Sequence, residues 1–307
     1  MAGSDPGRAH PAAVTGRERR AVLALRAMAN GHALVLGGGG VAGIAWMTGL
    51  LLGLAEAGQD VGGADVVIGT SAGANAAAQL GSGLSMDELF ARQVDPVLQA
   101  RELMAVIDWA KFAADLEPYL AGASTPAEQL RNFGRFALDA DTVPEPERIA
   151  VIESRLPSRE WPVTPMKLAA VDCVSGELTV FDAASGVSLV DAVAASSAVP
   201  GIWPPVTIDG RRYMDGGVRS ADNADLAAGA ARVVVISPLG MDSPLPTSMP
   251  LREVLTSLRE GGASVTVISP DEASVAAIGT NALDPATRVP AATAGRAQGR
   301  AGLPPAF

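Results

Sequence analysis

The sequence has 307 residues, 48% hydrophobic and 18% charged, which is enough to build a sizeable buried core and unlike a disordered chain. Its formal net charge of -10 argues against a nucleic-acid partner, because phosphate binding needs clustered Lys and Arg, and it disfavours adhesion to an anionic membrane. The single cysteine, Cys173, lies in an apolar run and predicts a buried, unreactive thiol without an intrachain disulfide. These features favour a globular protein, and we expect a cytoplasmic location.

Residues 1–30 form a polar leader that ends in a short helical pattern and contains no apolar signal segment. The most hydrophobic stretch, residues 44–58, is shorter than the roughly 20 residues that a membrane-spanning helix needs. We therefore expect it to be a helix packed in the core.

From residue 31 onward, strand and helix patterns alternate as they do in a parallel α/β sheet. The predicted elements are a strand at 32–36, a helix at 44–57, a strand at 64–69 and a helix from Ala72. Residues 84–160 are richer in aromatic and charged residues, which predicts a helical insertion, with Thr125 or Ser124 capping a helix that begins at Pro126. The fold class is therefore α/β, with a mainly parallel sheet flanked by helices.

The second half of the chain contains two hairpin patterns, over 166–181 and 205–217, with predicted turns at Ser175–Gly176 and Asp209–Gly210. Two further apolar strands are predicted within 231–238 and 263–270. We assign residues 31–280 to one domain and residues 281–307, which show little periodicity, to a low-complexity tail.

Ser71 lies in the pentapeptide GTSAG, which matches the G-x-S-x-G pattern, between a predicted strand and a predicted helix. Small residues around the serine permit a strained turn that exposes its hydroxyl group, as a nucleophile requires. The alternative is a serine that only caps the following helix. The pattern alone does not separate the two.

A nucleophilic serine needs a base, and no histidine follows Ser71 in the chain. His32 precedes it, but it begins the first strand and is predicted at the opposite edge of the sheet. Asp215, followed by two glycines at the end of a predicted strand, is the best candidate. The competing interpretation is an ordinary turn residue, as predicted for Asp209.

A glycine cluster follows the first strand and presents backbone N–H groups that suit an oxyanion or a phosphate. Gly38, Gly40 and Gly43 also match the dinucleotide-binding pattern G-x-G-x-x-G. That interpretation needs an acidic residue at the end of the second strand, where Ser71 stands instead. Nucleotide binding, or a protein without catalysis, is kept as the alternative function.

Together, the glycine loop, GTSAG and the DGG at Asp215 resemble the patatin-like phospholipase family in order and spacing. The resemblance covers roughly residues 32–240 and implies a three-layer α/β fold and a Ser71–Asp215 dyad. It further implies an oxyanion hole formed by Gly38, Gly39 and Gly40.

The implied activity is hydrolysis of phospholipids or related lipid esters, with no cofactor and no metal, and with transient contact to a membrane surface. One departure is Ala42, where the family usually has Arg or Lys. Walls for an acyl chain are predicted from the insertion and from residues 198–205, and Trp203 in that segment is expected to be a core side chain rather than a lipid contact.

Overall fold

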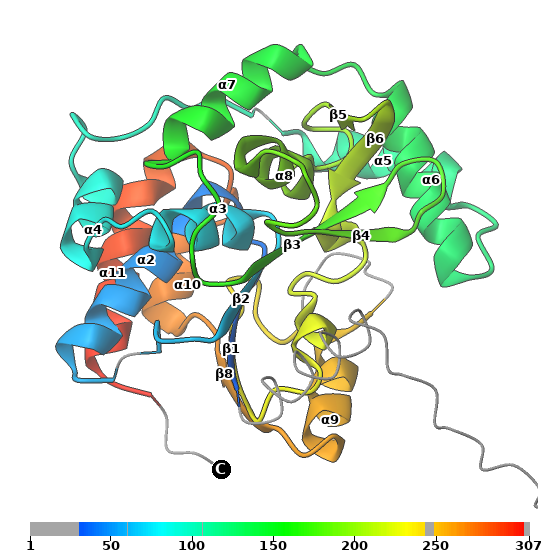
Figure 1. The fold of residues 1–307 in the computed structure, drawn as a ribbon. Coiled ribbons are helices and arrows are strands. Elements are labelled where there is room, and N and C mark those ends of the chain that lie inside the picture. The colour runs from blue at the N-terminus through cyan, green and yellow to red at the C-terminus, as the bar shows by residue number, and fades with distance from the viewer. Residues whose placement is uncertain (1–30, 60, 106, 243–248, 304–307) are drawn as a thin grey trace, which may run out of the picture.

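A computed structural model describes residues 31–303 except 60, 106 and 243–248 (Figure 1). The predicted leader lies outside the described residues. The strands form one mixed sheet with the order β5-β6-β3-β2-β1-β7-β8, and β4 pairs with β3. The strands are β1 (His32–Leu36), β2 (Val66–Gly69), β3 (Met166–Asp172), β4 (Leu178–Phe181), β5 (Val206–Ile208), β6 (Arg211–Asp215), β7 (Arg232–Ile236) and β8 (Ser264–Ile268).

Helices connect the strands and cover the sheet on both faces (Figure 1). They are α2 (Gly40–Glu56), α3 (Ala72–Leu80), α4 (Met86–Val94), α5 (Trp109–Leu120), α6 (Pro126–Asp139), α7 (Glu145–Arg155), α8 (Leu189–Ser196), α9 (Leu251–Glu260), α10 (Glu272–Ile278) and α11 (Arg288–Arg300). The described residues also include the 3-10 turns η1 (Gly216–Val218), η2 (Ala224–Ala227) and η3 (Pro285–Thr287). The helix expected near Thr125 is α6, whose capping box joins Thr125 and Glu128.

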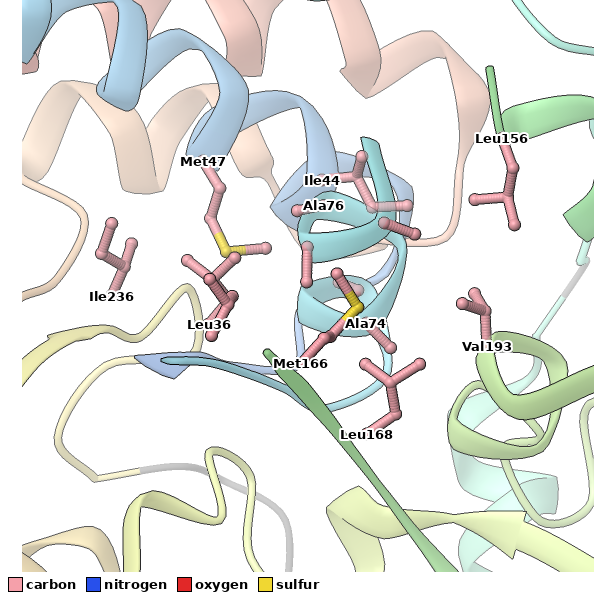
Figure 2. Close-up of a cluster of buried hydrophobic side chains, with 14 of the residues drawn as sticks. Leu36, Ile44, Met47, Ala74, Ala76, Leu156, Met166, Leu168, Val193 and Ile236 are labelled. Atoms are coloured by element: carbon pink, nitrogen blue, oxygen red, sulfur yellow. The ribbon is translucent and has the colours of Figure 1, made fainter. Parts of the chain in front are cut away.

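Side chains on the two faces of β1 alternate and belong to two separate hydrophobic clusters. Leu34 and Leu36 of β1 pack with α2, α3, α8 and α11, whereas Ala33 and Val35 pack with η2 and α9. Figure 2 shows part of the larger core, in which Leu36, Met47 and Leu168 surround α3. The three-layer α/β fold is therefore confirmed, as is the helical insertion, which consists of α4 to α7.

Both predicted hairpins are present as antiparallel pairs, β3 with β4 and β5 with β6. Asp209 and Gly210 both have positive φ, 49° and 76°, as a tight two-residue hairpin turn requires. The two later strands, β7 and β8, are parallel to β1 in the same sheet. Asp209 is thus the plain turn residue that we expected.

The segment after residue 280 differs from the expected tail, because it contains η3 and α11, and α11 packs along α2 (Figure 1). Gly295 allows this contact, since a Cβ there would lie 2.2 Å from the Trp46 carbonyl oxygen. A helix that packs through glycine and alanine carries no strong apolar stripe, so periodicity in the sequence does not reveal it. Within the part of the chain described here, no helix has the length and apolar character needed to cross a bilayer.

Candidate active site

The sheet register brings the ends of β2 and β6 together on one edge of β3. Gly69, at the end of β2, pairs with Leu168, and Asp215, at the end of β6, pairs with Ala170. Both Leu168 and Ala170 also pair with β4, which occupies the opposite edge of β3. Since β2 and β6 approach this edge from opposite directions, their last residues meet, and Ser71 follows directly after β2.

Ser71 occupies a strained turn between β2 and α3. Its φ of 55° and ψ of -113° lie in a region that favours glycine, and its side chain makes no capping hydrogen bond to α3. The Ser71 N–H donates to Ser196 Oγ at 3.0 Å, and Asn75 Nδ2 donates to the Ser71 carbonyl oxygen at 3.1 Å. Ser197 Oγ also donates to that carbonyl at 3.3 Å. The backbone is thus held on both sides while the hydroxyl group is not engaged as a helix cap.

The Asp215 side chain is buried, 4% exposed, and lies beside Ser71. Burial raises the pKa of Asp215 to about 6. Hydrogen bonds from the Ser71 side chain and the Gly217 N–H, together with the positive charge of Arg148, act in the opposite direction and lower this pKa. The Gly217 N–H donates to Asp215 Oδ1 at 2.7 Å, and the Asp215 N–H donates to the Ala198 carbonyl at 2.9 Å. The two residues that the sequence singled out are therefore neighbours in space.

The glycine loop between β1 and α2 lies against the Ser71 turn. A Cβ at Gly38 would be 3.7 Å from Ser71 Cβ. The Gly38 N–H donates to the Ala221 carbonyl at 2.8 Å, so this donor is used within the fold. Gly40 begins α2, where the first N–H groups of a helix have no partner within the helix, and it lines the cavity that contains Ser71.

Asn223 connects the loops that carry Ser71 and Asp215, and the sequence did not single it out. Its Nδ2 donates to Thr70 Oγ1 at 3.1 Å, to the Gly216 carbonyl at 3.1 Å and to the Ser220 carbonyl at 2.8 Å. It is fully buried, and its φ of 46° is left-handed, a conformation in which Asn is enriched. Asn in a turn-rich segment was the only available signal, and it does not distinguish this position from a surface turn.

A cavity beside Ser71 is lined by both predicted walls. The insertion contributes Glu102, Arg148 and Arg155, and the segment after α8 contributes Val199 and Trp203. Trp203 is 5% exposed, as expected of a core side chain, and it also contacts the guanidinium of Arg148, whose central carbon lies 4.0 Å from the ring centroid.

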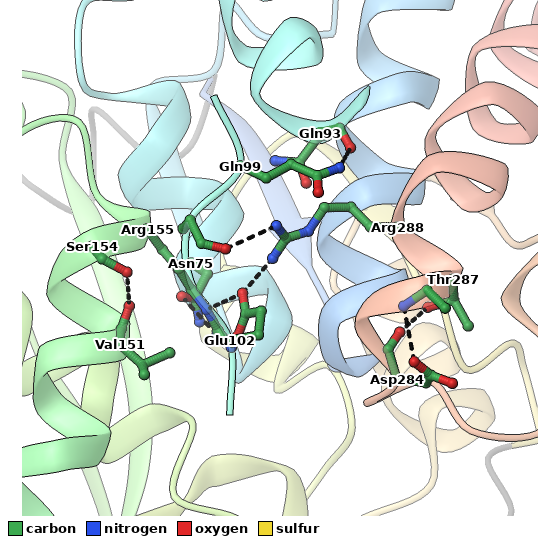
Figure 3. A network of polar contacts seen from close by, with 12 residues as sticks. Asn75, Gln93, Gln99, Glu102, Val151, Ser154, Arg155, Asp284, Thr287 and Arg288 are labelled. Atoms are coloured by element: carbon green, nitrogen blue, oxygen red, sulfur yellow. Dashed lines mark hydrogen bonds and ion pairs between the residues drawn. The ribbon is translucent and has the colours of Figure 1, made fainter. Parts of the chain in front are cut away.

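A buried ion network supports this wall (Figure 3). Arg155 donates through Nε and Nη2 to the two oxygens of Glu102 at 3.0 and 2.5 Å, and through Nη1 to Asn75 Oδ1 at 3.3 Å. Arg288 of α11 also donates to Glu102 and to the Ala100 carbonyl. The segment expected to be a tail thus fixes the position of Glu102. No periodicity or motif in the sequence links these residues.

His32, the other residue considered as a base, lies away from this centre. His32 is at the amino end of β1, and Ser71 follows the carboxyl end of the parallel strand β2. The expectation that His32 lies at the opposite edge of the sheet is therefore confirmed.

Cys173 is buried, and burial raises the pKa of its thiol to about 12. Among the described residues, no cluster of three or more His, Cys, Asp or Glu is arranged to hold a metal ion.

The fold and this site define an α/β protein in which a strained serine after one strand faces a buried aspartate after another. A family model described as patatin-like phospholipase matches residues 34–228. The chain therefore belongs to the patatin-like phospholipase family, whose members are lipid acyl hydrolases.

Solved structures with related folds include VipD from Legionella pneumophila, with 14% identity and a TM-score of 0.44 over 88% of this chain. Another is the type III effector protein ExoU, with 19% identity and a TM-score of 0.36 over 89% of this chain. The chain spans 66% of the VipD chain and 52% of the ExoU chain. A comparison with curated proteins found no match.

Proposed function

We propose that this protein is a serine acyl hydrolase that cleaves ester bonds of phospholipids or related lipids, with Ser71 as nucleophile and Asp215 as base. The observation that carries the proposal is the strained Ser71 turn, whose side chain faces a buried carboxyl group instead of capping α3. Residues 34–228, which match the family model, include both residues.

The environment of Asp215 supports its role as a base. An aspartate at its ordinary pKa is a poor base at neutral pH, but with a pKa of about 6 it is ionised at pH 7 and accepts a proton more readily. In the proposed reaction, Asp215 takes the Ser71 proton as Ser71 attacks the ester carbonyl. Asp215 returns this proton to the leaving alcohol. It then takes a proton from a water molecule that attacks the acyl-enzyme ester, and the acyl group is released as an acid while Ser71 regains its proton.

We assign the oxyanion hole to the Gly38–Gly40 loop. Because the Gly38 N–H already donates to Ala221, we place the donors at Gly39 and Gly40, at the positive N-terminus of α2. Ala42 is fully buried and carries no charge, so the loop stabilises the oxyanion with backbone N–H groups and the helix dipole.

A second and larger cavity, of about 980 Å³, is our candidate site for an acyl chain. It lies over α5 and α6, and its wall includes Phe112, Phe136 and Ile202. Trp203 lines both this cavity and the one that contains Ser71, so an acyl chain that enters here reaches the nucleophile past its ring. We propose a lipid ester as the substrate, transient membrane contact and a cytoplasmic location.

A panel of esters from short to long acyl chains, assayed on wild type and Ser71→Ala, tests the function. We expect wild type to hydrolyse the esters and to be labelled by a fluorophosphonate probe, and Ser71→Ala to do neither. Trp203→Ala should change the dependence on chain length while labelling persists. A folded wild-type sample that hydrolyses none of the esters and is not labelled would refute the proposal.

A further inference from the structure

Arg148 is a buried cation with an incomplete set of partners. It lies in α7, is 4% exposed, and its Nε and Nη1 atoms are buried without a hydrogen-bond partner among the described groups. A guanidinium carries five N–H donors, and a buried one normally uses them on carboxylates or carbonyls. The face of the group is covered by the Trp203 ring, which attracts the charge but accepts none of its in-plane N–H groups.

The neighbouring carboxylates are already engaged. Both Glu102 oxygens accept from Arg155, and Arg288 adds a further hydrogen bond to one of them. Asp215 accepts from Gly217 and Ser71. Three buried arginines therefore face only two buried carboxylates, and the cluster has an excess of positive charge even when Asp215 is ionised.

This excess charge lies in the cavity of the nucleophile. Arg148, Arg155 and Ser71 line the same cavity, with Trp203 between Arg148 and the larger cavity. An anion that enters beside Ser71 would meet the guanidinium of Arg148, which lines this cavity, in a site sheltered from water where charge-assisted hydrogen bonds are strong. A planar guanidinium suits the paired oxygens of a phosphate group.

We propose that Arg148 binds a phosphate group of the substrate beside the scissile ester, so that the enzyme prefers phosphate-bearing esters to neutral ones. This inference rests on the proposed hydrolase function. A free phosphate ion presents the same oxygens as the phosphate of a lipid headgroup, and the experiments below separate binding of the two.

Two monomeric substrates compare a phosphate-bearing ester with a neutral one, namely dihexanoylphosphatidylglycerol and dihexanoylglycerol, which differ by the phosphoglycerol headgroup. Arg148 also lowers the pKa of Asp215, so kcat/KM is measured at pH 8.5, well above the pKa of about 6 that Asp215 has in the protein. For Arg148→Met we expect the ratio of kcat/KM, phosphate-bearing over neutral, to fall about 10- to 100-fold, the effect of losing hydrogen bonds to a charged group.

Two further variants serve as controls. Arg148→Lys keeps the charge and should recover part of the ratio. Arg159→Met removes an exposed arginine, 70% exposed and just beyond α7, and should leave the ratio unchanged. A thermal melt confirms that each variant is folded. If Arg148→Met lowers kcat/KM for both substrates by the same factor, or changes neither, the ratio is unchanged and Arg148 does not bind the phosphate.

Binding without turnover separates this proposal from the hydrolase function. Calorimetry on Ser71→Ala, with and without Arg148→Met, uses dihexanoylphosphatidylglycerol and inorganic phosphate as probes. If the lipid binds, its binding depends on Arg148 and inorganic phosphate does not bind, the site recognises a lipid headgroup. If inorganic phosphate binds as tightly as the lipid and its binding also depends on Arg148, the site recognises free phosphate. If neither binding depends on Arg148, the proposal is wrong. If wild type hydrolyses no ester while binding does depend on Arg148, the hydrolase function fails and the anion site stands.

Discussion

Replacing Asp215 by Asn should stabilise the protein increasingly as the pH rises, while it removes the proposed base. Burial raises the pKa of Asp215 from 3.8 to about 6, so the folded state binds the proton more tightly than the unfolded state. The stability that comes from this tighter proton binding is fully present below the ordinary pKa of an aspartate, and it is lost as the pH rises through about 6. At 1.36 kcal/mol per pKa unit, the ionised group costs about 3 kcal/mol at neutral pH.

Asn is a neutral side chain of the same shape and carries no such cost. The difference in free energy of unfolding between Asp215→Asn and wild type should therefore grow by about 1.4 kcal/mol between pH 5 and pH 8, by the same linkage relation. Urea unfolding at several pH values measures it. Asp222, buried under the glycine loop and with its pKa raised to about 7 by burial, titrates in both proteins and cancels in the difference.

The same variant should lower kcat/KM by roughly 10²- to 10⁴-fold, the contribution of a positioned general base. In wild type, kcat/KM should fall below pH 6 as Asp215 becomes protonated. A stability difference that stays constant from pH 5 to pH 8 would refute the reasoning, because it would mean that Asp215 has an ordinary pKa. Retained activity in Asp215→Asn would exclude it as the base.

Three other changes test the framework around the dyad. Ser71→Gly should raise the free energy of unfolding by about 1 kcal/mol, because glycine adopts a φ of 55° without strain. It should also abolish fluorophosphonate labelling. A lower free energy of unfolding would contradict the inference that the Ser71 backbone is strained. Asn223→Ala removes the hydrogen bond to Thr70 in the Ser71 loop and those to Gly216 and Ser220 in the loop after Asp215. It should reduce kcat more than it changes KM in steady-state assays, whereas an unchanged kcat would argue against a positioning role. Gly295→Ala places a Cβ 2.2 Å from the Trp46 carbonyl oxygen. It should lower the free energy of unfolding, measured in urea, by about 1–3 kcal/mol. An unchanged urea midpoint would refute close packing between α2 and α11.

Local patterns in the sequence predicted the elements that short-range rules govern. Apolar runs bounded by glycine predicted the strands, and Asp209–Gly210 predicted a hairpin turn. A capping residue at Ser124 or Thr125 predicted the start of α6, which Thr125 caps in the structure. The tail prediction failed because α11 depends on contact with α2, a long-range interaction that glycine-rich composition hides.

The sequence by itself determined which residues are candidates for the site, since the glycine loop, Ser71 and Asp215 lie in short motifs whose backbone requirements depend on adjacent residues. Only the tertiary structure decided what surrounds them. The register on β3 brings Ser71 and Asp215 together, Asn223 joins their loops, and Arg148 enters the cavity from α7. These contacts join residues far apart in the chain, and pairing and burial at such distances are set by the packed fold, not by local sequence.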